Sequence, residues 1–386
     1  MNTLDFFKSD ILTLPKKHDG VNFILYVEDL YNKFLFEVDK INEGTIVDRI
    51  DQLKNTLKEF CDKILLSLKT YYQGFPAKAY FIFEEAINET QDFFLPKGSV
   101  TESFNIPFFR ARTGKNFPYE RHQMFHLPFD MREEVTTQRF SVPGLPCLYL
   151  SNCSYVCWEE LGRPLISEMQ VSRFKLEKKT FKWLDISLTP NTQAFMMEVL
   201  SSEQGTKLSG KDLQTTIDDH DAVNMTLIMR WPLLAACSIV VAKKEGKFKP
   251  EYIFPQFLLQ WVCHSKKADG IKYYSIECKS LLEPYHAKLI NYAVPVKTIG
   301  YKGYCPELVS TFSLTQPVSW ELLQAVNPKV IDHDHEKYKS VVYELGLDTA
   351  MFYLQLIKGK QTLYTHSTFG KIDIELSSME YAQINT

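Results

Sequence analysis

The chain lacks the signals of several protein classes. Its N-terminus has no basic stretch followed by an apolar segment, and the longest apolar run, 231–242, is too short to span a bilayer. It has no long basic run, and 44 basic residues stand against 47 acidic ones, which argues against wholesale binding of nucleic-acid phosphates. We therefore expect a cytoplasmic protein without a membrane partner.

Common site motifs are also absent. The eight cysteines include no CxxC pair, so we expect reduced thiols, and the glycines form neither a Walker loop nor a Rossmann fingerprint. His122 and His126 have a helical i, i+4 spacing but no evident third ligand, and His333 and His335 lie in a polar, loop-like stretch. We predict no metal site. The adjacent Cys263 and His264 lack the acidic or amide partner of a thiol hydrolase.

What the chain has is a globular composition, with 45% apolar and 24% charged residues in 386 positions, enough for more than one domain. Apolar residues recur at steps of three and four before Gly74 and Pro76, which predicts a helix that ends there. Segments 21–40 and 77–95 give two more helices. We predict an all-α domain over 1–98. The residues of the first stripe are Ile46, Ile50, Leu53, Leu57, Phe60, Ile64 and Leu68.

This helical domain could resemble ribonucleases of the HEPN type, which need an arginine followed a few residues later by a histidine. Its only arginine is Arg49, and no histidine follows before His122. We therefore expect a HEPN-like fold at most, without nuclease residues, and a regulatory or interaction role.

After Pro96–Gly98 the pattern changes to short apolar segments broken by proline and glycine, which predicts an α+β domain over 99–310 and a C-terminal extension, 311–386, packed on it. Expected helices are 153–161, 211–225, 255–265 and 319–325. Expected strands are 148–151, 236–242, 271–274, a hairpin formed by 170–176 and 180–186, and strand-like 353–366.

The segment Gln138–Pro164 is the most informative one. Arg139, a Pro143–Gly144 turn, Tyr149 and the pair Glu159–Glu160 follow at short intervals. A cation, an aromatic face and a carboxylate are the groups needed to hold a dinucleotide and to stabilise positive charge developing on a ribose. The sequence therefore indicates a glycosyl-bond chemistry.

These motifs, in this order, resemble the RES domain, a family similar to ADP-ribosyltransferases. The likeness runs from Phe108 to Ser275. FFRAR supplies Arg110 and Arg112, and the central block supplies Arg139, Phe140, Tyr149 and Glu160, while DGIKYYS supplies Ser275. Common family members carry tryptophan and asparagine where Phe140 and Ser141 stand here, which is a departure from the pattern.

The resemblance implies an ADP-ribosyltransferase-like fold that consumes NAD+ as a substrate, with no true cofactor. Glu160, Arg139, Tyr149 and Ser275 would be catalytic, and Arg110, Arg112, Phe140, Ser141 and Glu159 would contact NAD+. Arginines suit the pyrophosphate, Tyr149 the nicotinamide ring, and Glu160 the ribose. Since adjacent helical residues point about 100° apart, Glu159 and Glu160 cannot both face one pocket.

The function implied is that of a toxin that cleaves the nicotinamide–ribose bond of NAD+, as a glycohydrolase or phosphorylase. Its setting would be a toxin–antitoxin pair, with an antitoxin protein as partner, or phage defence. One alternative is an ADP-ribosyltransferase that modifies a protein or a nucleic acid. We expect a nucleic acid as a partner only if it is the target of ADP-ribosylation. Another is a non-catalytic module that binds NAD+. The sequence gives no oligomeric state.

Overall fold

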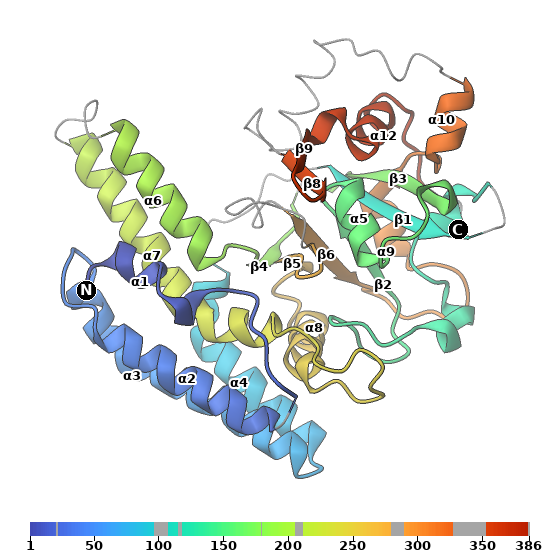
Figure 1. Cartoon of the computed structure of the whole chain (residues 1–386). Coiled ribbons are helices and arrows are strands. Elements are labelled where there is room, and N and C mark those ends of the chain that lie inside the picture. Colours follow the sequence, from blue (N-terminus) through green and yellow to red (C-terminus); the bar gives the residue numbers. More distant parts are fainter. Residues whose placement is uncertain are drawn as a thin grey trace. The chain divides into compact units, whose positions relative to one another are not determined.

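The chain divides into two compact units in a computed structural model that describes residues 1–20, 22–95, 107–114, 118–178, 180–204, 211–278, 289–326 and 353–384 (Figure 1). The helical unit comprises Met1–Gly98, Gln138–Phe140 and Leu188–Trp261. The mixed unit comprises Ser99–Thr137, Ser141–Ser187 and Val262–Thr386. A helical N-terminal region followed by a mixed unit with a sheet confirms the predicted α+β class.

Besides Met1–Gly98, the helical unit includes Leu188–Trp261, and the last segment of the mixed unit, Val262–Thr386, runs across the predicted bound at residue 310. Aromatic contacts explain this. Phe34 stacks on Trp231 with ring centroids 4.1 Å apart, and the Tyr31 hydroxyl donates to the carbonyl of Pro232 at 3.0 Å. These side chains are buried, so the helices around residue 231 complete the core that the first helices begin.

The helical unit is built on amphipathic helices. In α3 the predicted stripe holds: Ile50, Leu57, Phe60 and Ile64 are buried, and the chain turns at Gly74 with φ +89°. The helices are α1 (Thr3–Phe7), α2 (Phe23–Asp39), α3 (Val47–Tyr72), α4 (Pro76–Phe94), α6 (Pro190–Gln204) and α7 (Lys211–Cys237), with 3-10 turns η1 (Asp10–Leu12) and η6 (Pro250–Tyr252). Helix α8 (Ile253–Ser265) begins in this unit, and its residues from Val262 on are counted with the mixed unit.

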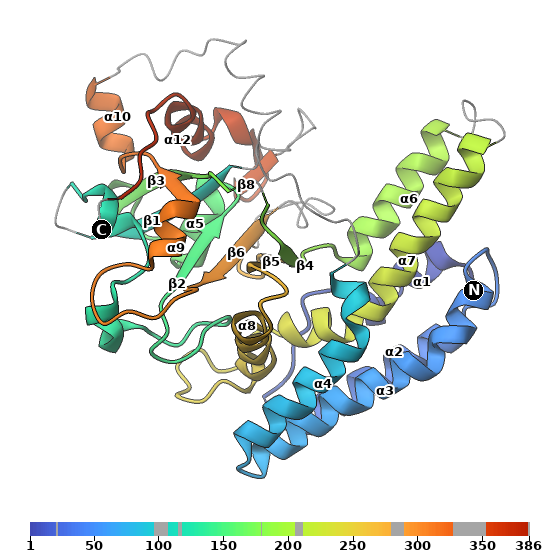
Figure 2. The same ribbon diagram turned by 180° about the vertical axis from the view of Figure 1, so that it is seen from behind.

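The mixed unit holds a seven-stranded sheet of order β4-β5-β6-β2-β1-β3-β7 (Figure 2). Its pairs are antiparallel except for the parallel pair β4–β5. The strands are β1 (Phe108–Thr113), β2 (Cys147–Ser151), β3 (Met169–Leu176), β4 (Trp183–Ile186), β5 (Gly270–Tyr274), β6 (Ile290–Pro295) and β7 (Phe312–Leu314).

Helices cover both faces of this sheet. The helices α5 and α12 share one apolar cluster with β1 and β3, whereas α9 shares the other cluster with β2 and β6 (Figures 1 and 2). The remaining elements are α5 (Ser154–Glu160), η3 (Arg121–Met124), η4 (Phe129–Glu134), η5 (Ile166–Glu168), α9 (Pro306–Thr311), α10 (Trp320–Val326), the hairpin β8 (Tyr353–Ile357) and β9 (Lys360–Leu363), η9 (Tyr364–His366) and α12 (Thr368–Ser377).

Two local predictions were wrong. Segments 170–176 and 180–186 are strands β3 and β4, but β3 pairs with β1 and β7, while β4 pairs with β5 at the far edge. Segment 236–242 is not a strand, because α7 runs on to Cys237 and irregular chain follows. A short apolar run does not by itself distinguish a strand from a buried helix end.

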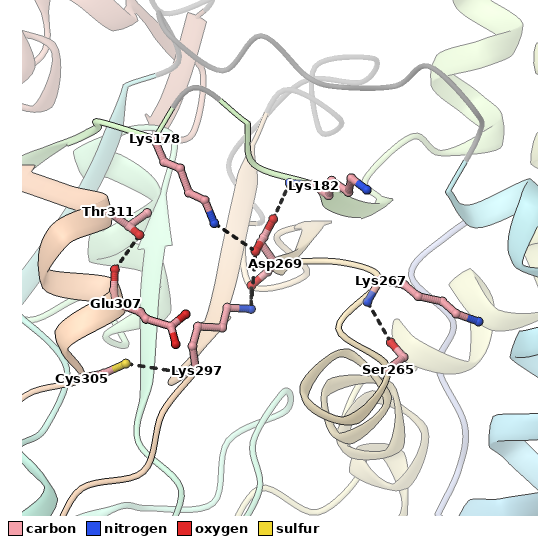
Figure 3. Close-up of polar contacts among 9 residues, drawn as sticks. All are labelled: Lys178, Lys182, Ser265, Lys267, Asp269, Lys297, Cys305, Glu307 and Thr311. Atoms are coloured by element: carbon pink, nitrogen blue, oxygen red, sulfur yellow. Dashed lines mark hydrogen bonds and ion pairs between the residues drawn. The ribbon is translucent and has the colours of Figure 1, made fainter.

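Polar contacts fix the start of β5 (Figure 3). The Asp269 carboxylate accepts the backbone N–H of Lys182 at 2.9 Å, and Lys297 Nζ donates to the Asp269 carbonyl at 2.5 Å. Gly270 follows, where an added Cβ would lie 2.7 Å from the Trp183 ring and 3.0 Å from the Ala293 carbonyl oxygen. These contacts fix the start of β5, and they thereby fix the register in which the other end of β5 pairs with β6.

Candidate functional site

The floor of the site is formed by polar side chains on β2 and β6. Alternation along β2 sends Leu148 and Leu150 into one apolar cluster, so Tyr149 and Ser151 face the opposite side. Ser151 pairs in register with Asn291 of β6, and its hydroxyl donates to Asn291 Oδ1 at 2.6 Å. Two polar groups are thereby locked together on the sheet.

Glu160 is held above this pair. It is the last residue of α5, and its Oε1 accepts the Ser275 hydroxyl and the Asn291 amide, each at 2.6 Å. Ser275 and Asn291 are 2% and 3% exposed, whereas the glutamate is exposed. The carboxylate therefore reaches solvent while buried donors hold it from below. The structure brings Glu160 and Ser275 together, although 115 residues separate them in the sequence.

Glu159 points elsewhere. Its carboxylate is buried, and it accepts the Tyr155 hydroxyl at 2.5 Å and Arg163 Nε at 2.8 Å. Arg163 also lies over the Trp158 ring and has a left-handed φ of 62°. A buried carboxylate that accepts hydrogen bonds from two residues anchors the turn after α5. This leaves Glu160 as the acid that faces the polar cluster.

Tyr149 shares the face of this cluster. It pairs with Ala293, two residues after Asn291 along β6, and Tyr273 of β5 pairs with Asn291 itself. Burial raises the pKa of Tyr149 well above its usual range, and the nearby Cys147 and Tyr273 raise it further. The phenol is therefore neutral at pH 7 and offers an aromatic surface.

Arg110 lies beside the same strand. Its Nη1 donates to the Tyr149 carbonyl at 2.9 Å, and its Nε has no hydrogen-bond partner. Burial and Arg112 lower the pKa of Arg110 to about 9, because both disfavour its charge. Arg112 donates to the Phe125 carbonyl at 3.0 Å. Within the described residues neither guanidinium forms an ion pair with a carboxylate, so the positive charge of the two side chains would favour the binding of an anion there.

The central arginine of the motif belongs to the other unit. Arg139 and Phe140 are part of the helical unit, where Arg139 donates to the Cys237 carbonyl at 3.0 Å and lies over the Tyr252 ring. Phe140 is buried, as is Ser141, the first residue of the next segment of the mixed unit. Glu160 and Ser275 belong to the mixed unit, and the predicted role of Arg139 stays a prediction.

The site has members that sequence reasoning missed, namely Ser151, Asn291 and Tyr273. Ser151 and Asn291 are polar residues within otherwise apolar strands, a pattern that could have singled them out. Their pairing could not have been found, since 140 residues separate them.

Two thiols of the mixed unit, Cys278 and Cys263, are not activated. Burial raises the pKa of Cys278 well above its usual range, and the charges of Glu160 and Glu159 raise it further. Burial likewise raises the pKa of Cys263 to about 11. Both thiols are therefore protonated at pH 7.

His122 and His126, which have the i, i+4 spacing, each contact neighbouring protein groups. His126 is buried, its Nε2 accepts the Cys305 N–H at 3.0 Å, and its Nδ1 lies 2.7 Å from the Leu127 carbonyl. His122 lies on a 3-10 turn against Glu120. Across the described ranges no group of three or more His, Cys, Asp or Glu side chains could hold a metal ion. The stretch with His333 and His335 lies outside the described residues.

The chain is similar to one curated protein in particular. It is 34% identical over 311 residues to a protein of Bacillus subtilis (strain 168) described as "Putative toxin YopC", and the match spans 78% of this chain. The chain covers 66%, just under two thirds, of that relative's length. No protein-family model matches, and no solved structure does. In the part of the chain that the structure describes, no helix is long and apolar enough to cross a membrane.

Proposed function

We propose that the mixed unit binds NAD+ as a substrate, cleaves its nicotinamide–ribose bond, and thereby acts as a toxin of the RES type. The observation that carries the proposal is the cluster in which Glu160 accepts hydrogen bonds from Ser275 and Asn291 on the sheet face that also carries Tyr149. The cluster combines an exposed carboxylate with an aromatic surface, and an arginine lies beside it.

Glu160 is the group that would act on the reacting atoms. Breaking the bond between ribose C1′ and the nicotinamide nitrogen sends the electron pair to the ring, which leaves neutral, while positive charge develops on the ribose. A preorganised carboxylate stabilises such an oxocarbenium-like transition state. Since the donors that hold Glu160 are buried, the carboxylate needs little rearrangement as that charge appears.

The neighbouring residues suit the rest of the substrate. The neutral ring of Tyr149 can stack against nicotinamide, an aromatic contact of about 0.5–1.5 kcal/mol. Arg110 and Arg112, without carboxylate partners among the described residues, match the pyrophosphate, which arginine can bind through two donors at once. The acceptor of the ADP-ribosyl group is water, inorganic phosphate or a macromolecule.

The description of the relative as a toxin supports the biological half of the proposal. Loss of NAD+ would arrest growth, and such a protein would need restraint in its own cell. We therefore include an antitoxin protein as a partner and a regulatory role for the helical unit.

The proposal is tested by nicotinamide release from NAD+ with purified protein. We expect release by the wild type and a loss of 100-fold or more, on the order of 3 kcal/mol of transition-state stabilisation, in Glu160→Gln. Glu177→Gln is the matched control, since Glu177 also accepts a serine hydroxyl, that of Ser313 at 2.5 Å, on the same sheet.

Equal rates for the wild type and Glu160→Gln would reject Glu160 as the key carboxylate. Labelled ADP-ribose appearing on a protein or nucleic acid would favour transfer over simple breakdown. Protection of the protein by NAD+ in thermal melts, without any turnover, would favour a binding module.

A further inference from the structure

We propose that Ser151 and Asn291 are positioning residues that aim the Glu160 carboxylate and keep it ionised. Ser151 orients the Asn291 amide, and the Asn291 amide orients the Glu160 carboxylate. The relay rests on two contacts of 2.6 Å each, from Ser151 Oγ to Asn291 Oδ1 and from Asn291 Nδ2 to Glu160 Oε1. Its catalytic consequence rests on the proposed function, whereas its electrostatic consequence does not.

The direction of the hydrogen bonds determines which group of Asn291 faces Glu160. The Ser151 hydroxyl donates to the amide oxygen of Asn291, which leaves the NH2 group of that amide directed at the glutamate. A donor at this position favours a charged carboxylate over a neutral acid. Ser275 donates to the same oxygen, so two buried donors converge on Oε1.

The need for such a relay follows from the place of Glu160. It ends a helix of seven residues, and its side chain is exposed, so without these contacts it would sample several rotamers. The sheet supplies the rigidity, because Ser151 and Asn291 are register partners on neighbouring strands. A donor anchored in a sheet holds a carboxylate more accurately than one in a loop.

The titratable groups named around Glu160 are a thiol, a carboxylate and a phenol. Burial raises the pKa of the Cys278 thiol well above its usual range and keeps it protonated. Glu159 of the same helix is bonded by Arg163 and Tyr155. On the sheet face, Tyr149 is neutral at pH 7, as its raised pKa implies.

The test compares four variants of the full chain with the wild type. Asn291→Ala removes the donor, Asn291→Asp replaces it with a second carboxylate, and Ser151→Ala releases the amide without touching Glu160. Ser313→Ala is the matched control, since it removes a serine–glutamate hydrogen bond elsewhere on the sheet. The primary measurement is carbon-13 NMR titration of the Glu160 carboxyl, identified by its absence in Glu160→Gln.

We expect the Glu160 titration to move to higher pH by about one unit in Asn291→Ala and by about two units in Asn291→Asp. Ser151→Ala moves it less, and Ser313→Ala leaves it in place. The acid limb of the pH profile of nicotinamide release shifts in the same order. A purely structural role for Asn291 would lower activity at every pH without moving that limb.

Unchanged Glu160 titration in Asn291→Ala and Ser151→Ala overturns the relay. If the wild type releases no nicotinamide but the titrations shift as expected, the proposed function fails and the relay stands. Should Asn291→Asp not fold, as judged by its melting transition, Asn291→Ala and Ser151→Ala decide the question.

Discussion

At the scale of single residues, the surroundings decide what two identical side chains do. Glu159 and Glu160 are adjacent, yet the first is buried against Tyr155 and Arg163, and the second is exposed and accepts a hydrogen bond from the buried Ser275. The 100° step between helical neighbours predicts this divergence but not its direction. The direction follows from the partners, which come from other parts of the chain.

His126 gives a prediction of pH dependence. Burial lowers its pKa to about 4, so the unfolded chain, with a histidine pKa near 6.5, takes up the proton first. The stability that the neutral ring contributes is therefore complete above pH 6.5 and is lost as the pH falls toward 4. Between pH 7 and pH 5, we expect the wild type to lose about 2 kcal/mol more of its unfolding free energy than His126→Gln.

Urea unfolding at the two pH values measures this difference. His122→Gln is the matched control, since its ring is 44% exposed and it should keep the pH dependence of the wild type. If His126→Gln and the wild type lost equal stability, the buried ring would not be the cause.

At the scale of elements, the site depends on the antiparallel pair of strands β5 and β6. The start of β5 is fixed by Asp269 and Lys297 (Figure 3), and Ser275, which follows its other end, donates a hydrogen bond to Glu160. Because β5 pairs with β6 in a single register, the same strand pair positions Asn291. A disturbance at the anchored end should therefore be felt at the site.

Gly270→Ala tests this coupling. Its Cβ would overlap Trp183 and the Ala293 carbonyl, so we expect a loss of about 1–3 kcal/mol in unfolding free energy together with a loss of nicotinamide release. Gly303→Ala is the comparison, because its cost comes from a φ of +68°, and its added Cβ would meet no atom within 4 Å. It should lose stability in denaturant unfolding but keep its activity. Full activity in Gly270→Ala would refute the coupling.

At the scale of the whole molecule, the chain returns to its helical unit after entering the mixed one. We expect a fragment of residues 99–386 to be poorly soluble and to melt without a cooperative transition, because removal of 1–98 uncovers the partners of Phe34 and Tyr31 around residue 231. Solubility and circular-dichroism melting of the fragment check this. A soluble, cooperatively folded fragment would show that the predicted boundary at residue 98 is a true domain boundary.

The sequence predicts those features of the fold that depend on neighbouring residues. The stripe of α3 and the strands around residues 148 and 271 could be predicted because periodicity is a property of neighbouring residues. The pairing of β4 with β5 could not be predicted, since 84 positions separate the end of β4, Ile186, from the start of β5, Gly270, and only the fold brings the two strands together. The meeting of Glu160 with Asn291 is of the same long-range kind.

The central claim is that this protein consumes NAD+, and its products test that claim most directly. Purified full-length protein is incubated with NAD+, with and without inorganic phosphate, and the mixture is resolved by mass spectrometry. We predict free nicotinamide in equal amount to ADP-ribose, or to a phosphorylated ADP-ribose when phosphate is the acceptor. NAD+ recovered intact from folded, wild-type protein would contradict the account.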